Sequence, residues 1–349
     1  MPTFTPAYLE QIGTQVFEAI SVPADEASLV AKELVYANLL GMDSHGIIRV
    51  PQYVNTIADG EIVPGAKTTL SKETATTAIV DGGHNFGQVV AFRALDIALE
   101  KARTHNISCV LAHNCNHVGR LGAYPQRAAE QDMICLATTT WPMYGHHVAP
   151  FGGREGRLST NPIAYGIPTD DHPVLADFAT SVMSEGKVRV SLHQGNPLPD
   201  NAIVDSAGKP TNDPADFYGP PKGAMLTFGG LVGYKGYALS LLVEILGATL
   251  AGIQVDDPER LGNGLCLIVI NPAAFGDLIN FKALMADVST YMKSAELADG
   301  FQEILMPGEL DFRNVARRQQ EGIPLADTTW TQIQKAAHSV GVEVKIESE

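Results

Sequence analysis

The spacing of apolar residues predicts that the chain begins with two helices. Helical periodicity covers residues 6–20 and, more regularly, residues 22–41. Pro23 fits the first turn of the second helix, and Gly41 fits its C-terminal stop. We therefore expect residues 1–60 to form a small helical unit.

Short apolar runs that end in turn residues predict buried strands farther along the chain. Longer segments with apolar residues at helical spacing separate these strands. This alternation indicates an α/β fold with a mixed (α+β) sheet, and the chain returns to helices near its C-terminus. The predicted strands are residues 76–81, 107–113, 133–140, 173–181 and 264–272, and the predicted helices are residues 88–106, 123–132, 234–252, 277–295 and 328–341.

Two long stretches lack a clear period. Residues 141–170 are predicted to be rich in loops, and residues 185–228 to be loop with occasional short strands. Within the first stretch, Asn161 precedes Pro162, and a following proline disfavours helical backbone. We expect Thr160 and Asn161 to be presented by extended chain.

Composition and charge narrow the class of partner. Of the 349 residues, 45% are hydrophobic and 18% are charged, so a large core is available and disorder is not expected. The net charge of −15 argues against nucleic acid and anionic membranes as partners. The longest apolar run, residues 237–252, is interrupted by Glu244 and by glycines, and it predicts a buried helix and not a membrane span.

The cysteines and the N-terminus favour a cytoplasmic location. The four cysteines form no CxxC pair, and three lie in apolar runs, which predicts reduced and mostly buried thiols. The first residues contain neither a basic segment nor a long apolar core, so no signal peptide is expected.

The clearest candidate for chemistry follows the end of the second helix. Asp43, Ser44, His45 and Arg49 come directly after Gly41. Histidine exchanges a proton near neutral pH, and arginine binds a carboxylate through two parallel hydrogen bonds. The pattern favours a site that binds an acid and moves a proton. The competing interpretation is a histidine that only forms the turn.

His117 and Asp177 occupy positions where α/β proteins often place functional residues. His117 lies in a loop after the predicted strand 107–113, and Asp177 lies within the predicted strand 173–181, where its apolar part ends. A carboxylate there can orient an imidazole and stabilise its charged form. The competing interpretation of Asp177 is a cap for the segment that follows.

No standard nucleotide-binding or hydrolase motif is present. The chain lacks GxGxxG, a P-loop and a GxSxG elbow, and the glycines of GGLVGYKG have a different spacing. Lys235, at the start of the predicted helix 234–252, is a candidate for binding phosphate beside free amide donors, or else a solvated lysine. These motifs by themselves leave the function open.

His113, Cys115 and His117 raise the question of a metal site, which His146 and His147 could complete. The spacing matches no standard metal motif, and alternating residues of a strand point to opposite faces. We therefore predict no metal. A metal-dependent hydrolase that uses His113 and His117 is the competing class of function.

Six segments in order resemble the malate/L-lactate dehydrogenase family of type 2, which also contains ureidoglycolate, sulfolactate and diketogulonate enzymes and piperideine-carboxylate reductases. The resemblance covers nearly the whole chain, and GNPLPDNAIVDSAGKPTNDP most resembles the hydroxycarboxylate dehydrogenase B branch. The six segments are GMDSHGIIRVPQYV, NHVGRLGAY, APFGGREGRLSTNPIAYGIP, DFATSVMSEGKVRV, LPDNAIVDSAGKPTNDP and GYKGYALSLLVEILGATLAG.

The resemblance implies a hydride transfer between NAD or NADP and a 2-oxo or 2-hydroxy acid. It also implies a cofactor domain that is not a Rossmann fold, a homodimer and, as an alternative substrate within the family, a cyclic imine carboxylate. On this interpretation residues 1–65 and 300–349 form a helical domain from both termini, residues 66–135 form an α/β substrate-side region and residues 136–299 form the NAD(P)-binding domain.

The resemblance further implies roles for individual residues. His45 is the implied acid/base, oriented by Asp177, and His117 is a second catalytic histidine. The implied substrate-binding residues are Ser44, Arg49, Tyr53 and Thr160, with Arg49 on the substrate carboxylate. The implied cofactor-binding residues are Thr140, Asp177, Phe178, Ala179, Thr180, Ser181, Tyr234, Lys235, Gly308 and Glu309.

Overall fold

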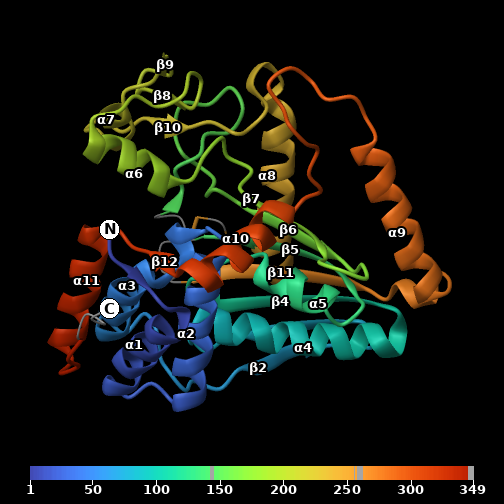
Figure 1. Ribbon diagram of the computed structural model, residues 1–349. Helices are drawn as coiled ribbons and strands as arrows, with labels where there is room; N and C mark the ends of the chain where they lie inside the picture. The colour runs from blue at the N-terminus through green and yellow to red at the C-terminus, as the bar shows by residue number, and fades with distance from the viewer. Residues whose placement is uncertain (142–144, 255, 258–261, 345–349) are drawn as a thin grey trace.

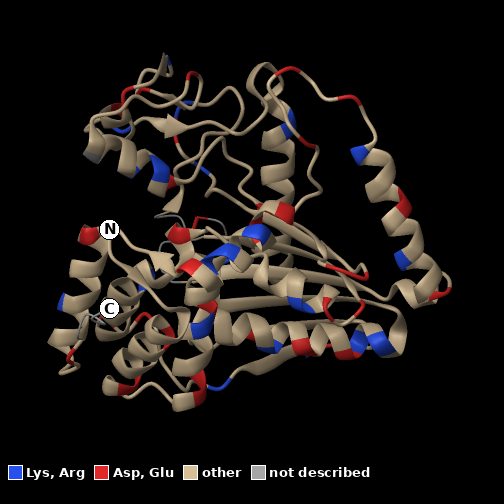
Figure 2. Cartoon of the chain, viewed as in Figure 1, with Lys and Arg blue, Asp and Glu red and all other residues tan. Residues whose placement is uncertain are grey.

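The computed structural model describes residues 1–141, 145–254, 256–257 and 262–344 (Figure 1). A helical layer, a central sheet and a smaller lobe with short strands can be followed in the ribbon. Lysine, arginine and acidic residues lie mainly on helices and loops, whereas the central strands are largely free of them (Figure 2). This distribution is typical of a sheet that forms the interior of the molecule.

The two ends of the chain contribute to one helical layer. Strand β1 (Thr3–Phe4) pairs antiparallel with β12 (Ile323–Pro324), so the terminal segments lie side by side (Figure 1). Phe17 and Tyr53 share an apolar core with Trp330. The other elements of this layer are α1 (Pro6–Ala19), α2 (Ala24–Leu39), the 3-10 turns η1 (Asp43–His45) and η2 (Ile47–Arg49), α3 (Val50–Ala58), α10 (Glu309–Glu321) and α11 (Asp327–Ser339).

The central sheet has seven strands in the order β2-β3-β4-β11-β5-β6-β7. Their bounds are β2 (Thr69–Glu73), β3 (Thr77–Asp81), β4 (Ile107–Cys115), β5 (Ile134–Thr140), β6 (Ile163–Ile167), β7 (Val174–Phe178) and β11 (Asn263–Ile270). Strands β3 and β4 are parallel and are joined by α4 (Gly87–His105), and the other neighbours are antiparallel. Helices α4 and α5 (Ala123–Ala129) cover one face and α8 (Tyr234–Gly247) the other (Figure 1).

The smaller lobe holds three short strands and two helices around its own core. The core residues include Val148, Val188, Ile203, Phe217 and Met225. The strands pair in the order β10-β8-β9. The bounds are β8 (Ile203–Val204), β9 (Pro210–Thr211), β10 (Ala224–Met225), α6 (Glu185–Gln194) and α7 (Pro214–Tyr218).

The α/β class and most of the predicted elements are confirmed, but residues 185–228 are not all loop and short strand. Helix α6 begins after Ser184 and ends at Gly195, whose φ is 68°. Among the described side chains of α6 only Val188 is buried, so the apolar period that would predict a helix is missing. Also unpredicted were α3, α10, β2 and β6.

Asn161 does not lie in extended chain, contrary to prediction. Its φ is 38°, a left-handed conformation that asparagine tolerates better than most residues. The amide Nδ2 donates to the Ser240 carbonyl oxygen and to Glu244 Oε2, each at 3.0 Å. These buried bonds hold the turn that precedes β6.

The sequence predicted a buried helix over residues 237–252, but α8 is only partly buried. Helix α9 (Leu278–Lys293) has no buried residue. Leu241, Leu242 and Ile245 of α8 are 41–47% exposed because they point away from the sheet. Helix α9 stands apart from the body at the far side of the sheet (Figure 1). The remaining 3-10 turns are η4 (Gly230–Val232), η5 (Thr249–Ala251) and η6 (Pro272–Ala274).

The predicted regions 66–135 and 136–299 share the central sheet. Strands β2, β3 and β4 come from the first region, β6, β7 and β11 come from the second, and β5 crosses the boundary between them. The division into a substrate-side region and an NAD(P)-binding domain therefore crosses one sheet, and it stays a prediction.

We predict that Gly87→Ala destabilises the fold. A Cβ at this first residue of α4 would lie 2.2 Å from the Asn116 carbonyl oxygen and 2.4 Å from that of His117. We expect a loss of about 1–3 kcal/mol in the free energy of unfolding, measured by urea denaturation. Gly186→Ala in α6 is the matched control, because a Cβ there meets nothing within 4 Å and should be neutral or slightly stabilising. Equal stability of the two variants would contradict the prediction.

Candidate active site

The turn that contains His45 is built on one buried amide. Asn38, near the end of α2, is 1% exposed. Its Oδ1 accepts the Ile47 N–H at 2.8 Å, and its Nδ2 donates to Asp43 Oδ1 at 2.7 Å. A Cβ at Gly46 would lie 2.2 Å from Asn38 Oδ1, so only glycine allows this approach. Asn38 therefore fixes the two successive turns around His45.

Asp43 supports the turn from its other side. Arg318 on α10 donates from Nη1 to Asp43 Oδ1 at 2.7 Å and from Nη2 to Oδ2 at 3.2 Å. Arg318 also donates to the carbonyl oxygen of Asn38. Asp43 thus ties the turn to the C-terminal part of the chain.

His45 and His117 lie next to each other although they are far apart in the sequence. Their ring centroids are 5.7 Å apart, and the planes are inclined by 20°. Ser44 Oγ lies 3.0 Å from His45 Nδ1. The indole of Trp141 meets His117 edge to face, with 5.9 Å between ring centroids. The fold brings together two of the three predicted catalytic residues.

His117 is held by two buried residues from α3 and α4. The Tyr53 hydroxyl lies 2.8 Å from His117 Nδ1. Gln88 Nε2 donates to the Tyr53 oxygen at 2.9 Å. Tyr53 is 0% and Gln88 2% exposed, so water cannot replace either bond. Tyr53, predicted to bind substrate, contacts His117 itself.

Arg49 belongs to the same cluster. Its Nε donates to the Ser44 carbonyl oxygen at 2.7 Å, and its Nη1 donates to Gln52 Oε1 at 2.5 Å. Within the described part of the chain, Nη2 has no hydrogen-bond partner. The fixed guanidinium therefore retains a donor for a carboxylate.

Burial and neighbouring positive charge keep both imidazoles neutral. Burial, with smaller contributions from Arg49 and Arg120, lowers the pKa of His45 from 6.5 to about 4. Burial, Arg49 and His45 together lower the pKa of His117 well below its ordinary value. Near pH 7 both rings are therefore neutral.

Asp177 lies in β7, as predicted, but its hydrogen bond goes elsewhere. Its Oδ2 accepts the Gly122 N–H at 2.7 Å. Burial raises the pKa of Asp177, while the Gly122 bond and the charge of Arg120 lower it. Asp177 and His45 are both described, and no hydrogen bond joins them. The orientation of His45 by Asp177 stays a prediction.

Arg120 is a residue of this region that was not predicted. It is 5% exposed, its Nη2 donates to Gln126 Oε1 at 2.8 Å, and its guanidinium lies 5.6 Å from the ring centre of Tyr36. Its Nε and Nη1 are buried without a hydrogen-bond partner among the described residues. The charge of Arg120 lowers the pKa of both His45 and Asp177. Arg120 therefore links these two groups electrostatically.

Thr160 is held by the segment that follows β7. The Thr180 N–H donates to the Thr160 carbonyl oxygen at 3.0 Å, and the Thr180 hydroxyl donates to that of Asn161 at 2.9 Å. These bonds join the substrate candidate Thr160 to the cofactor candidates of the same segment. The other candidates there are Phe178, which is exposed, Ala179, which is half-buried, and Ser181, which is buried.

Thr140 and the start of α8 form a second group of cofactor candidates. Thr140 is 1% exposed and donates to Glu244 Oε2 at 2.6 Å, so its hydroxyl is occupied within the core. Tyr234 and Lys235 are exposed in the first turn of α8. That turn has no side-chain cap, which leaves backbone N–H groups free for an anion.

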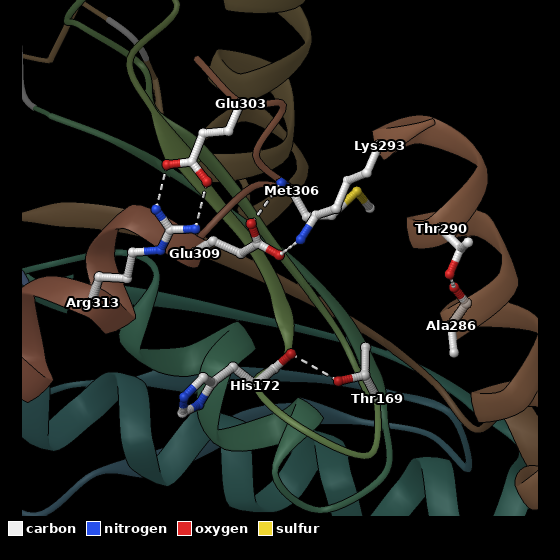
Figure 3. Close-up of polar contacts among 9 residues, drawn as sticks. All are labelled: Thr169, His172, Ala286, Thr290, Lys293, Glu303, Met306, Glu309 and Arg313. Atoms are coloured by element: carbon white, nitrogen blue, oxygen red, sulfur yellow. Dashed lines mark hydrogen bonds and ion pairs between the residues drawn. The ribbon is translucent and has the colours of Figure 1, made fainter. Parts of the chain in front are cut away.

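Gly308 and Glu309 mark the start of α10. Gly308 has a φ of 93°, and a Cβ there would lie 3.1 Å from Leu175 of β7. The Glu309 carboxylate accepts the Met306 N–H at 3.3 Å and is paired with Lys293 at the end of α9 (Figure 3). No hydrogen bond of the described residues joins this group, or the start of α8, to the His45 turn.

The residues weighed as metal ligands, for which no metal was predicted, do not form a cluster in the described part of the chain. Over that part of the chain, no group of three or more histidine, cysteine or acidic residues is arranged to hold a metal ion. His113 is half-buried on β4, and the hydrogen bond of His117 goes to Tyr53. The geometry therefore gives the hydrolase alternative no support.

Comparisons with known proteins agree with the site. The sequence model of the family "Malate/L-lactate dehydrogenase" matches residues 4–334. The chain is 36% identical to L-sulfolactate dehydrogenase of Methanothermobacter thermautotrophicus over 95% of both chains. It is also 36% identical to hydroxycarboxylate dehydrogenase B of Escherichia coli K12, over 94% of this chain and 91% of that protein.

A solved structure leads to the same family. A putative malate/lactate dehydrogenase from E. coli superposes with a TM-score of 0.90 at 35% identity, over 98% of this chain and 96% of that one. The chain belongs to the malate/L-lactate dehydrogenase family, as its sequence motifs predicted. The predicted enzyme class, an NAD(P)-dependent hydroxy acid dehydrogenase, is confirmed by this membership.

Sequence reasoning missed Asn38, Gln88 and Arg120. Two of them had a usable signal, since a polar residue stands on an apolar helical stripe. Asn38 follows Leu34 by four positions, and Gln88 precedes Leu95 by seven. Arg120 lies in the segment NHVGRLGAY, which carried part of the family resemblance, but neither periodicity nor spacing singled it out.

Among the described residues no helix is both long and apolar enough to cross a membrane.

We predict that acid destabilises the fold partly through His45. Its folded pKa of about 4 lies below the reference value of 6.5, so between these values the unfolded chain binds more protons. Stability should fall as the pH is lowered through this window. In His45→Gln the loss of unfolding free energy between pH 7 and pH 5, measured by urea unfolding, should be smaller by about 2 kcal/mol.

The control for this experiment is His338→Gln, which removes an exposed histidine of α11. Between pH 7 and pH 5 this variant should lose as much free energy of unfolding as the unmodified chain. The account of His45 is wrong if His45→Gln and His338→Gln lose the same free energy between the two pH values.

Proposed function

We propose that the protein transfers a hydride between NAD(P)H and C2 of a 2-oxo acid, or the reverse from a 2-hydroxy acid, with His45 as acid/base. The observation that supports this most is the cluster of His45, His117 and Arg49. Two neutral imidazoles stand beside a guanidinium that keeps a free donor. Such a set can bind a carboxylate and exchange one proton at the adjacent oxygen.

Arg49 holds the substrate carboxylate in this proposal. Ser44 and Thr160 supply hydroxyl groups at the edge of the carboxylate site. Tyr53 contributes indirectly, because it holds His117. The bonds from Arg49 to Ser44 and Gln52 fix the guanidinium before substrate arrives. A fixed carboxylate determines which face of C2 meets the hydride donor.

His45 accepts the alcohol proton in the oxidation direction. Its lowered pKa favours this, because the neutral ring is present near pH 7. In the reduction direction the protonated ring returns the proton to the oxygen, where negative charge develops. Asp177 stabilises that charged ring in the proposal, and Arg120 opposes it.

The residues of the chain fit a pyridine nucleotide. The uncapped start of α8 beside Lys235 offers backbone N–H groups and positive charge to a phosphate. In this proposal the segment from Asp177 to Ser181, together with Gly308 and Glu309, completes the cofactor site. When bound, NAD(P)H supplies the hydride. The chain positions the acid and the proton-transfer group.

The substrate is a 2-oxo or 2-hydroxy acid of the kind named for the relatives. Two relatives are named hydroxycarboxylate dehydrogenase B and L-sulfolactate dehydrogenase. The first substrates to test are therefore small hydroxy acids with or without a second anionic group. A cyclic imine carboxylate is the alternative, in which the imine nitrogen takes the place of the ketone oxygen.

Exposed apolar residues support the proposed homodimer. On α9 they recur at helical spacing and point away from the body, whereas Lys282 and Lys293 on the other side pair with Asp132 and Glu309. A stripe of this kind is typical of an interface between subunits. Its residues are Leu284, Val288, Tyr291 and Met292, which are 42–75% exposed.

None of the four cysteines, all of which lie in the described part of the chain, forms a disulfide, which supports a cytoplasmic location.

The direct test follows the absorbance of NADH or NADPH with a panel of acids. The panel contains pyruvate, oxaloacetate, 2-oxoglutarate, phenylpyruvate, hydroxypyruvate, a 2-oxo acid with a sulfonate and a cyclic imine acid. We expect oxidation of one dihydronicotinamide with at least one 2-oxo acid. Oxidation with the imine alone would favour the alternative substrate. No cofactor binding and no oxidation would refute the proposal.

We predict that His45→Ala lowers kcat at least about a hundredfold, because the proton transfer loses its acid/base. Cofactor affinity, measured by quenching of protein fluorescence, should stay near that of the unmodified chain. A kcat within a fewfold of normal would move the acid/base role to His117. His338→Ala, far along α11, is the control and should leave kcat unchanged.

We predict that Val288→Asp converts a dimer into a monomer in sedimentation analysis. A charge in the centre of the α9 stripe would be buried on association without a partner. Ala286→Asp, on the opposite side of the helix and also exposed, should leave the dimer intact. A dimer that survives Val288→Asp would place the interface elsewhere.

A further inference from the structure

Gln88 is a buried polar residue for which the proposed chemistry has no use. It stands in the first turn of α4 and is 2% exposed. Its Nε2 donates to the Tyr53 oxygen at 2.9 Å, while its Oε1 has no hydrogen-bond partner among the described residues. An amide that leaves one buried group unpaired costs free energy, so the bond that it does make calls for an explanation.

The bond from Gln88 decides where the proton of Tyr53 points. A phenol has one O–H donor, and its oxygen already accepts from Gln88. Among the described residues its other hydrogen-bond partner is His117 Nδ1, at 2.8 Å. The Tyr53 hydroxyl therefore donates to His117. Burial raises the pKa of Tyr53 to about 12, so this proton is present at any working pH.

We propose that Gln88 is a positioning residue that fixes the tautomer of His117. Because Nδ1 accepts a hydrogen bond, the neutral ring must have its proton on Nε2. His117 then offers an N–H donor to a bound oxygen and has no lone pair there for a proton. His45 is left as the ring that accepts the proton. This division of roles rests on the proposed function, but the tautomer itself does not.

The charged groups around His117 also favour its neutral form. Arg49 on η2 and His45 on η1 both lower its pKa, and Tyr53 on α3 presents a neutral hydroxyl. None of these groups supplies a negative charge that would stabilise a protonated ring. The neutral tautomer fixed from Gln88 therefore persists over the range in which the fold is stable.

The test uses the full chain with ¹⁵N-labelled histidine and no ligand. The ¹⁵N shifts and their proton couplings tell which ring nitrogen is protonated, and loss of one signal set in His117→Asn assigns His117. We expect the proton on Nε2. A proton on Nδ1 in the unmodified chain would overturn the proposal.

Gln88→Glu should reverse the hydrogen-bond chain. A carboxylate accepts the Tyr53 proton, so the Tyr53 oxygen must accept from His117 Nδ1, and the His117 proton moves to that nitrogen. The added negative charge should also raise the pKa of His117. In turnover this variant should lose at least about tenfold in kcat at pH 7 and show a shifted pH profile. An unchanged tautomer in a folded Gln88→Glu would overturn the proposal.

Gln126→Glu is the matched control. Gln126 is also a buried glutamine that donates to a tyrosine hydroxyl, that of Tyr36, at 2.9 Å, but no histidine follows in that chain. Its variant should leave the His117 signals unchanged. If Gln88→Glu does not fold, Gln88→Met replaces it, and both tautomers should then be seen, since nothing orients the Tyr53 proton. A single Nε2–H form in Gln88→Met would count against the proposal.

The two hypotheses can fail separately. If His117 has the expected tautomer but no substrate is reduced, the proposed function fails and the role of Gln88 in positioning the ring stands. If substrate is reduced and the tautomer is wrong, the dehydrogenase proposal stands and Gln88 has only a structural role.

Discussion

The site depends on the buried side chain of Asn38. This one amide accepts the Ile47 N–H and donates to Asp43, and its bulk is accommodated only because residue 46 is glycine. A buried amide with both ends satisfied holds its partners in one arrangement, because any other arrangement would leave polar groups unpaired. That arrangement determines where His45 and Arg49 point. Arg318 then fastens Asp43 to the C-terminal helices, so both ends of the chain contribute to the turn.

The second half of the site depends on the start of α4. Gly87 lets the helix begin against the backbone of Asn116 and His117, and its neighbour Gln88 reaches Tyr53. Two adjacent residues therefore position the loop that contains His117: Gly87 through close backbone contact, and Gln88 through its hydrogen bond to Tyr53. Two imidazoles from different parts of the fold meet where these supports converge, and their shared burial keeps both neutral.

Sequence patterns predicted the helical ends, most strands of the sheet and the family, because apolar periodicity and motifs are local features. They did not predict α6, where Val188 alone of the described side chains is buried, nor the left-handed Asn161, whose conformation depends on Glu244 in a distant helix. His45, Arg49 and His117 could be chosen as candidates from their residue types. That Tyr53 contacts His117, and that Asp177 is bonded to Gly122, follows only from the three-dimensional packing.

The most direct test of the account is the fate of the hydride. The protein would be incubated with dihydronicotinamide deuterated on either face of C4 and with the best 2-oxo acid, and the product would be analysed by mass spectrometry and NMR. The account predicts deuterium at C2 of a single enantiomer of the 2-hydroxy acid with one of the two labelled cofactors and none with the other, because the site fixes both reacting faces. No deuterium at C2 with either labelled cofactor, or a racemic product, would contradict hydride transfer in a site organised by the His45 turn.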